Sequence, residues 1–197
     1  MTVRRTSEQT KTIILRAARD AFAAHGYERT TIRAVAADAG IDPSMVMRYF
    51  GSKEGLFDAA LTVDLRLPDL SAVSPDELPA ALVGHFVERW EGDPADDALL
   101  VLLRSAVTNE QAAERMRAVF ADQVAPALAA ALGPERASRA AGLVSAQLLG
   151  LALARYLLRL PAVTALGPRE LVAGLAPAVA ATLAAAPADA STPSDTP

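Results

Sequence analysis

Residues 31–50 of the chain read TIRAVAADAGIDPSMVMRYF, and the spacing of small and apolar residues in this stretch predicts two short helices joined by a tight turn. Ala36 lets its helix approach a neighbour closely, Gly40 permits the left-handed conformation of a sharp turn, and Val46 fills the angle between the helices. Asp42 suits the N-cap of the second helix, with a proline at its first position. The stretch predicts a helix-turn-helix corner.

The second helix of this corner presents one face for contact with another molecule. At about 100° per residue, Val46 and Phe50 point in one direction with Met47 beside them. The residues on the opposite face are Ser44, Met45, Arg48 and Tyr49. A short helix that is held by two others and presents such side chains has the geometry of a reader of the DNA major groove. A plain structural corner also needs a small residue and a glycine, so the pattern alone leaves that alternative open.

Residues that suit DNA phosphates flank the corner. Lys53 follows Ser52 at the start of the next helix, where backbone N–H groups and an ammonium group can hold a phosphate. Thr30 and Thr31 lie at the start of the preceding helix and suit the same contact. The basic residues that accompany them are Arg33, one turn into that helix, and Arg4 and Arg5, on an arm expected to be flexible.

Composition and charge limit the class of protein. The 197 residues are 52% hydrophobic but only 5% aromatic, and alanine dominates, which favours closely packed helices over sheet. The absence of cysteine excludes disulfides and cysteine metal sites. Residues 1–53 hold 9 Lys/Arg and 5 Asp/Glu (+4), whereas residues 54–197 hold 10 and 18 (−8). This asymmetry indicates a localised contact with a polyanion, although ordinary scatter of surface charge is the alternative.

Helix start and stop signals divide the chain into about nine helices and no strands, which predicts an all-α fold. The first helix is expected from about Ser7 to His25, with Gly26 as its stop, and a fourth starts after Ser52 and carries Leu65. Later helices are expected over residues 75–91, 94–107, 109–131, 135–160 and 168–186. The domains expected are a DNA-binding domain over 1–53, a connecting helix and linker over 54–74, a regulatory and dimerisation domain over 75–186, and a disordered tail over 187–197.

No targeting or membrane segment is expected. The opening MTVRRTSEQTK lacks the apolar core of a signal peptide. The charge-free run from Leu171 to Ala188 is mostly alanine and is interrupted by Pro177, so it is interpreted as a packing helix. A cytoplasmic location is therefore expected.

Residues 25–61, HGYERTTIRAVAADAGIDPSMVMRYFGSKEGLFDAAL, resemble the DNA-binding domain of the TetR/AcrR family of bacterial repressors. The matching features are Gly26-Tyr27, the Thr-Ile-x-x-Val-Ala start, Ala39-Gly40-Ile41, Tyr49-Phe50 and Ser52-Lys53-Glu54-x-Leu56-Phe57. The resemblance implies phosphate contacts at Thr31, Tyr49 and Lys53. It implies groove contacts at Arg33, Ser44, Met45 and Arg48. Met47 departs from the family pattern, which usually has a tyrosine that reaches the DNA backbone here.

The resemblance also implies a homodimer whose last two helices pair, and hence a palindromic operator in double-stranded DNA. The segments LVSAQLLGLALARYLLRL and ELVAGLAPAVAATLAAA are compatible with this, because they are too apolar on all sides for the surface of a monomer. The alternative is that both helices build the core of one chain.

A ligand cavity for a small, mostly apolar effector is a further implication. Gln147 and Arg155 are suggestive, because polar groups in an apolar helix need partners. Core packing of the apolar residues and an ion pair at Arg155 are the alternatives. The candidate lining residues are His85, Phe86, Trp90, Arg104, Met116, Phe120, Gln147, Arg155 and Tyr156.

The sequence favours a regulator over an enzyme or a ligand-independent architectural protein. It carries no motif of a nucleophilic serine, a zinc protease or a phosphate-binding loop. His85 and Glu88 share a helical face, but two ligands make a weak metal site, so neither metal nor cofactor is expected. An architectural protein would need basic stretches for wrapping DNA, and the body is acidic. The function expected is a ligand-responsive repressor.

Overall fold

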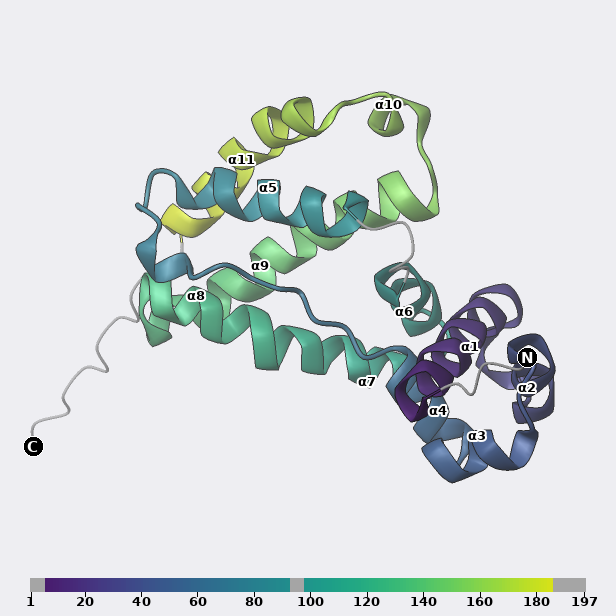
Figure 1. Cartoon of the computed structure of the whole chain (residues 1–197). Coiled ribbons are helices and arrows are strands. Elements are labelled where there is room, and N and C mark those ends of the chain that lie inside the picture. Colours follow the sequence, from purple (N-terminus) through teal and green to yellow (C-terminus); the bar gives the residue numbers. More distant parts are fainter. Residues whose placement is uncertain (1–5, 93–97, 186–197) are drawn as a thin grey trace, which may run out of the picture. The chain divides into compact units, whose positions relative to one another are not determined.

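The computed structural model describes residues 6–92 and 98–185, and every regular element in those ranges is helical (Figure 1). The described chain forms two compact units, one made of residues 6–64 and 98–117 and the other of residues 65–92 and 118–185. The all-α fold predicted from the sequence is confirmed. Arg4, Arg5 and the tail over 187–197 lie outside the described residues.

The first unit is organised around its long first helix, which packs against three others. Its elements are α1 (Ser7–Arg29), α2 (Ile32–Ala39), α3 (Pro43–Phe50), α4 (Lys53–Ala60), α6 (Ala98–Ala106) and most of α7 (Glu110–Val119). The rings of Phe22 and Phe57 meet edge to face at 4.8 Å in the core between α1 and α4. The other large side chains fully buried in this unit are Ile14, Val35, Val46, Leu56, Leu61 and Leu102.

Both ends of α1 follow from local chemistry. Thr6 accepts a hydrogen bond from the backbone N–H of Gln9, whose side chain accepts one from Thr6 in return, so a capping box starts the helix. Gly26 has a φ of 72° and interrupts the helical backbone, as its position in the sequence predicted. The side chain of Thr30 is buried and donates to the carbonyls of Ala21 and Gly26. The expectation that Thr30 holds a phosphate is therefore wrong.

The predicted helix-turn-helix corner is confirmed in α2 and α3. Gly40 adopts the left-handed conformation (φ 62°, ψ 39°) that ends α2. Ala36 and Val46 are fully buried where the two helices meet. Asp42 caps α3 by accepting from the backbone N–H of Ser44 at 2.8 Å. The corner is thus set by the small, flexible and capping residues at the positions that the sequence indicated.

The fourth helix is shorter than predicted, because α4 ends at Ala60 and does not reach Leu65. The hydroxyl of Thr62 donates to the carbonyl of Asp58, which satisfies one of the acceptors left open at the helix end. The backbone N–H of Leu65 donates to Oε1 of Gln123 at 2.8 Å, so a side chain distant in sequence replaces the helical acceptor. A tertiary contact has overridden the local preference for helix.

The second unit contains α5 (Leu78–Glu91), α8 (Ala125–Leu132), α9 (Pro134–Ala152), α10 (Pro161–Thr164), α11 (Pro168–Ala185) and a short 3₁₀ turn (Leu70–Ala72). Within it, α11 packs along α5, while α8 packs on α9 and on the 3₁₀ turn. Figure 1 shows α5 and α11 running alongside each other. The buried side chains of this core include Leu70, Leu78, Leu82, Val83, Leu128, Val144, Val179 and Leu183.

Two of the predicted long helices contain π-helical turns. The helix expected over 109–131 consists of α7, a π turn at Phe120–Val124 and α8. The helix expected over 135–160 consists of α9 and a π turn at Leu153–Leu157, so it ends three residues early. Leu160 precedes Pro161 and is not helical, with a ψ of 123°. The residue before a proline disfavours the helical conformation, which fits Leu160, and the chain has already left the helix at Arg159, whose φ is 55°.

One described helix, Pro134–Leu157, is long and apolar enough by composition to cross a membrane. Only 22% of its most apolar window is buried within the chain. A single helix of this kind is weak support for a membrane span, and an apolar helix that pairs with another protein chain has the same composition.

Candidate functional site

The exposed face of α3 consists of Ser44, Met47 and Arg48, with Met45 half-buried beside them. Val46 on the opposite side is fully buried and holds the helix against its neighbours. Met47 is 45% exposed, so the expectation that it lies beside Val46 on the packed side is wrong. It is about 100° from Val46 around the helix, which takes it out of the packed side.

The first turn of α3 is tied together by one carboxylate. Oδ1 of Asp42 accepts hydrogen bonds from both the hydroxyl and the backbone N–H of Ser44. These two hydrogen bonds lower the pKa of Asp42 below its ordinary value. Because the Ser44 hydroxyl donates its proton to Asp42, its oxygen can still accept a hydrogen bond.

The amino-terminal turn of α1 contributes to the same surface. The hydroxyl of Ser7 donates to Oη of Tyr49 at 3.2 Å. This hydrogen bond, together with the guanidinium group of Arg48, lowers the pKa of Tyr49. The Nζ atom of Lys11 lies 5.9 Å from the ring centroid of Tyr49, and Cζ of Arg48 lies 5.2 Å from it. The sequence prediction did not include Ser7 or Lys11, because Lys11 lies 38 positions before Tyr49.

Lys53 is held in place at the first turn of α4. Its Nζ atom donates to the carbonyl of Glu28 at 3.2 Å and lies 4.3 Å from the ring centroid of Tyr27. The hydroxyl of Tyr27 donates in turn to Oε1 of Glu54 at 2.8 Å. Burial, helped by this hydrogen bond, raises the pKa of Tyr27 to about 12. Ser52 caps α4 beside Lys53, so the ammonium group adjoins the positive end of a helix.

Thr31 and Arg33 are exposed at the start of α2. Oγ1 of Thr31 accepts from the backbone N–H of Ala34 at 3.1 Å and caps the helix, which leaves the hydroxyl proton for an outside acceptor. The predicted DNA-binding residues that the structure describes all lie in the first unit with part of their surface exposed. They are Thr31, Arg33, Ser44, Met45, Arg48, Tyr49 and Lys53.

The predicted ligand residues do not all lie in one unit. Arg104 and Met116 belong to the first unit, where Nη1 of Arg104 donates to the carbonyl of Ala23 at 3.3 Å and Met116 is buried. The candidates in the second unit are His85, Phe86, Trp90, Phe120, Gln147, Arg155 and Tyr156.

Three of these candidates form an aromatic cluster. The rings of Trp90 and Tyr156 stack at 4.8 Å with an interplanar angle of 4°, and Phe86 lies 5.8 Å from Trp90. The hydroxyl of Tyr156 donates to Oε1 of Glu91. Burial, followed by the charge of Glu91, raises the pKa of Tyr156. The cluster joins the end of α5 to the π turn after α9.

Arg155 forms an ion pair within the chain. Its Nε atom lies 2.8 Å from Oε1 of Glu91, and its Nη1 atom donates to the carbonyls of Val163 and Leu166. The side chain is only 12% exposed, so these contacts satisfy a charge that is largely removed from water. The structure therefore gives Arg155 a structural role in connecting α5 to the loop that contains α10.

Gln147 differs from Arg155, because its side chain is only partly satisfied. Its Nε2 atom donates to Oγ1 of Thr182 on α11 at 2.7 Å. Its Oε1 atom is buried and has no hydrogen-bond partner among the described residues. A buried acceptor without a partner is costly, so this atom suits a donor from a molecule outside the chain.

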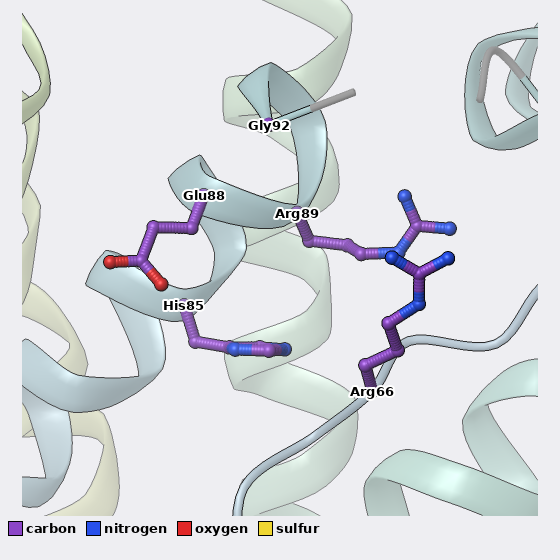
Figure 2. Close-up of a pocket in the computed structure, with 5 residues that line it drawn as sticks. All are labelled: Arg66, His85, Glu88, Arg89 and Gly92. Carbon is purple, nitrogen blue, oxygen red and sulfur yellow. The ribbon is translucent and has the colours of Figure 1, made fainter. Parts of the chain in front are cut away.

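A pocket of about 300 Å³ lies in the second unit, at the carboxyl end of α5. Its lining residues are Arg66, His85, Glu88, Arg89 and Gly92. Figure 2 shows the side chains of Arg66 and Arg89 extending to the same side, while the carboxylate of Glu88 points away from them. Of the predicted ligand residues, His85 lines this pocket. The described residues contain no group of three or more side chains that could hold a metal ion.

A compact helical unit that exposes one face of the second helix of a helix-turn-helix defines a class of nucleic-acid-binding proteins. Comparison with known families agrees. Residues 14–60 match the amino-terminal domain described as "Bacterial regulatory proteins, tetR family", and residues 76–183 match the "Tetracyclin repressor-like, C-terminal domain". The second match alone spans more than half of the chain. The chain therefore belongs to the TetR family of bacterial regulatory proteins.

Individual relatives are more distant. The transcriptional regulator RutR of Escherichia coli K12 is 34% identical over 79 residues, which cover 39% of this chain and 37% of RutR. A transcriptional repressor of Mycobacterium tuberculosis H37Rv is 34% identical over 82 residues, 42% of this chain and 43% of the repressor. The chain thus spans less than half of either relative. A crystal structure of a TetR-family regulator from Streptomyces coelicolor is 27% identical, with a TM-score of 0.63 over 93% of this chain and 99% of that one.

Proposed function

We propose that this protein is a transcriptional repressor that binds a palindromic DNA operator as a homodimer and releases it when a small effector binds. The observation that supports DNA binding is the exposed face of α3. Ser44, Met47 and Arg48 are exposed on it, while the fully buried Val46 fixes the helix from behind. A rigidly held helix with exposed polar and basic side chains suits direct readout of base edges, with Arg48 as the residue for guanine.

Phosphate contacts would fix the register of α3 in the groove. Thr31 and Lys53 lie at the starts of α2 and α4, where backbone N–H groups and the helix dipole favour an anion. Tyr49 and Lys11 lie together beside α3 and extend the same surface. We infer that these residues grip the DNA backbone on both sides of the groove that α3 enters.

Dimerisation is supported by the surface of α9. Leu143 of α9 is 52% exposed, and Leu153, the first residue of the π turn that continues α9, is 38% exposed; the small residues Ala146 and Gly150 are exposed between them. On α11 the exposed small residues are Gly174, Ala178 and Ala181. An apolar helix surface that is largely unburied within its own chain is typical of a protein–protein interface, and small residues allow a second helix to approach closely. We infer that α9 and α11 pair with those of a second copy.

A footprinting experiment tests the proposal. Purified protein is titrated onto labelled DNA from the region upstream of its own gene and onto shuffled DNA of the same length and composition. The expected result is protection of a two-fold symmetric site with half-site centres one helical turn, about 34–36 Å, apart. Equal affinity for the two DNAs would refute a sequence-specific regulator. Protection of an asymmetric site by a monomer would refute the dimer.

A further inference from the structure

The pocket at the carboxyl end of α5 is unusual in its charge. Its lining includes two guanidinium groups and an imidazole against one carboxylate, whereas residues 65–92 and 118–185 of the second unit are close to neutral, with 7 Arg and 8 Asp/Glu (−1). Two arginines directed to one side of a pocket of about 300 Å³ concentrate positive charge at one place in this unit. Arg89 lies in the last turn of α5, where it offsets the partial negative charge of the helix end. Arg66 comes from a different segment, outside α5.

The backbone before Arg66 is fixed on two sides. The carbonyl oxygen of Leu65 is 2.8 Å from Nε2 of His85, and because a carbonyl can only accept, Nε2 carries the proton and donates it. The backbone N–H of Leu65 donates to Gln123. These two contacts hold the chain at the residue that precedes Arg66, and one of them comes from a residue that also lines the pocket.

Arg66 itself has an uncommon backbone conformation, with a φ of 53°. A non-glycine residue in the left-handed region is strained and persists where its surroundings enforce it, and such residues cluster at binding sites. Here the conformation accompanies a side chain that extends to the same side of the pocket as Arg89 (Figure 2). Each guanidinium group has five N–H donors in a planar fork, so a contact within the protein leaves further donors for a ligand.

We infer that this pocket binds the anionic group, a carboxylate or a phosphate, of a small molecule, with Arg66 and Arg89 as the charged donors. Paired N–H donors of arginine match the two oxygens of either group. The volume lies at the lower end of the range for ligand pockets, roughly 300–1,000 Å³, so the ligand is small. The sequence predicted a mostly apolar effector, whereas the lining of this pocket selects for a negative charge. The inference rests on the proposed function in that it names the chemical class of the effector.

The site also suggests how binding is communicated. Leu65 and Arg66 are the first residues of the second unit after the chain leaves the first unit at Asp64. A ligand that binds Arg66 therefore contacts the segment that directly follows the first unit. If the anion favours the form that does not fit the operator, operator DNA must weaken anion binding by the same factor.

Isothermal titration calorimetry on the full chain tests the inference. The probes are inorganic phosphate, benzoate and the neutral benzamide, all at one ionic strength set with potassium chloride. We expect saturable binding of phosphate or benzoate, whichever group the pocket takes, and none of benzamide. Failure of both anions to bind at millimolar concentrations, or binding of benzamide as tight as that of the anion that binds, would overturn the inference.

Two variants localise the site. Arg66→Asn keeps a residue that tolerates a positive φ, and Arg89→Gln removes the second charge; each should weaken anion binding at least about tenfold. Arg159→Asn is the matched control, because Arg159 also has a positive φ (55°), lies in the second unit and is exposed, but does not line the pocket. A comparable loss in the control would overturn the assignment. Operator binding by the ligand-free parent is measured separately. If the parent does not bind an operator, the proposed function is refuted, whereas the anion site is judged by the calorimetry alone.

Discussion

Replacing Lys53 and Arg48 in turn by alanine separates the two kinds of DNA contact that the first unit would make. Lys53 adjoins the capped start of α4, where its ammonium group is held by the Glu28 carbonyl and the Tyr27 ring. This position of the ammonium group suits contact with a DNA phosphate. Arg48 is exposed on α3 beside Tyr49, where it suits a base edge. The two variants should therefore fail in different ways.

The size of the Lys53 effect follows from counterion release. Each phosphate contact contributes about 0.9 to the slope of log affinity against log salt, so two copies of Lys53 in a dimer contribute about 1.8. Over a fourfold rise in salt, the parent should lose roughly 12-fold more affinity than Lys53→Ala does. Arg48→Ala should instead weaken operator binding by about 1–3 kcal/mol, roughly 5- to 150-fold, and relax base preference at one position in each half-site.

Fluorescence anisotropy with labelled operator and unrelated DNA, at several salt concentrations, measures both quantities. Arg169→Ala controls for the loss of one positive charge, because Arg169 is exposed in the first turn of α11, in the other unit. Lys53→Ala should lose affinity for both DNAs, and Arg48→Ala mainly for the operator. Salt slopes and affinities that are the same in the parent and both variants would refute the assignment of α3 and α4 to DNA.

Three further predictions concern assembly and stability. Ala178→Glu should yield monomers that keep their helical content and lose operator binding, as measured by sedimentation and circular dichroism. Ala180→Glu, which is exposed about 200° around the same helix, should remain dimeric. A parent protein that sediments as a monomer at micromolar concentration would contradict this prediction. Thr30→Val removes a buried donor and should lower the free energy of unfolding by about 0.5–1.5 kcal/mol in chemical denaturation, and an unchanged stability would contradict the role given to the hydroxyl. Asp42→Ala should lower the Tm at neutral pH. Hydrogen bonds lower the pKa of Asp42 in the folded protein, so the stabilisation that Asp42 gives is present above the unfolded pKa of about 3.9. This stabilisation is lost as the pH falls through the folded pKa. A difference in Tm between the parent and Asp42→Ala that persists in strong acid would contradict the capping role.

The features that the sequence predicted well are those set by local chemistry. Gly40, Asp42 and Ser52 each end or cap a helix through atoms within a few residues, so their side chains and backbone preferences were sufficient to place them. Val46 was predictable because burial of one apolar residue between two short helices leaves few arrangements. Of the residues expected on the outward face of α3, Ser44 and Arg48 are exposed, whereas Met45 and Tyr49 are half-buried and Met47 is exposed against expectation.

The features that the sequence did not reveal depend on contacts between distant segments. Leu65 was expected in a helix, but Gln123 binds its backbone N–H, and no pattern near residue 65 indicates this. Lys11 joins Tyr49 only because α1 and α3 meet in the folded unit. The pocket likewise combines Arg66 with residues of α5 that are about 20 positions later, and its two arginines have no motif in common.

The packing of α6 on α1 means that the first unit cannot be moved to another protein as one continuous segment. A fragment that stops at Asp64 contains the whole helix-turn-helix but lacks Leu99 and Leu102, which are buried in α6. The side of α1 that α6 covers would then meet water, at a cost of about 25 cal/mol for each Å² of apolar surface exposed. Fusing this unit to another regulatory body would require transplanting two separate pieces of chain. During synthesis, the unit cannot complete its core until the ribosome has passed Arg117.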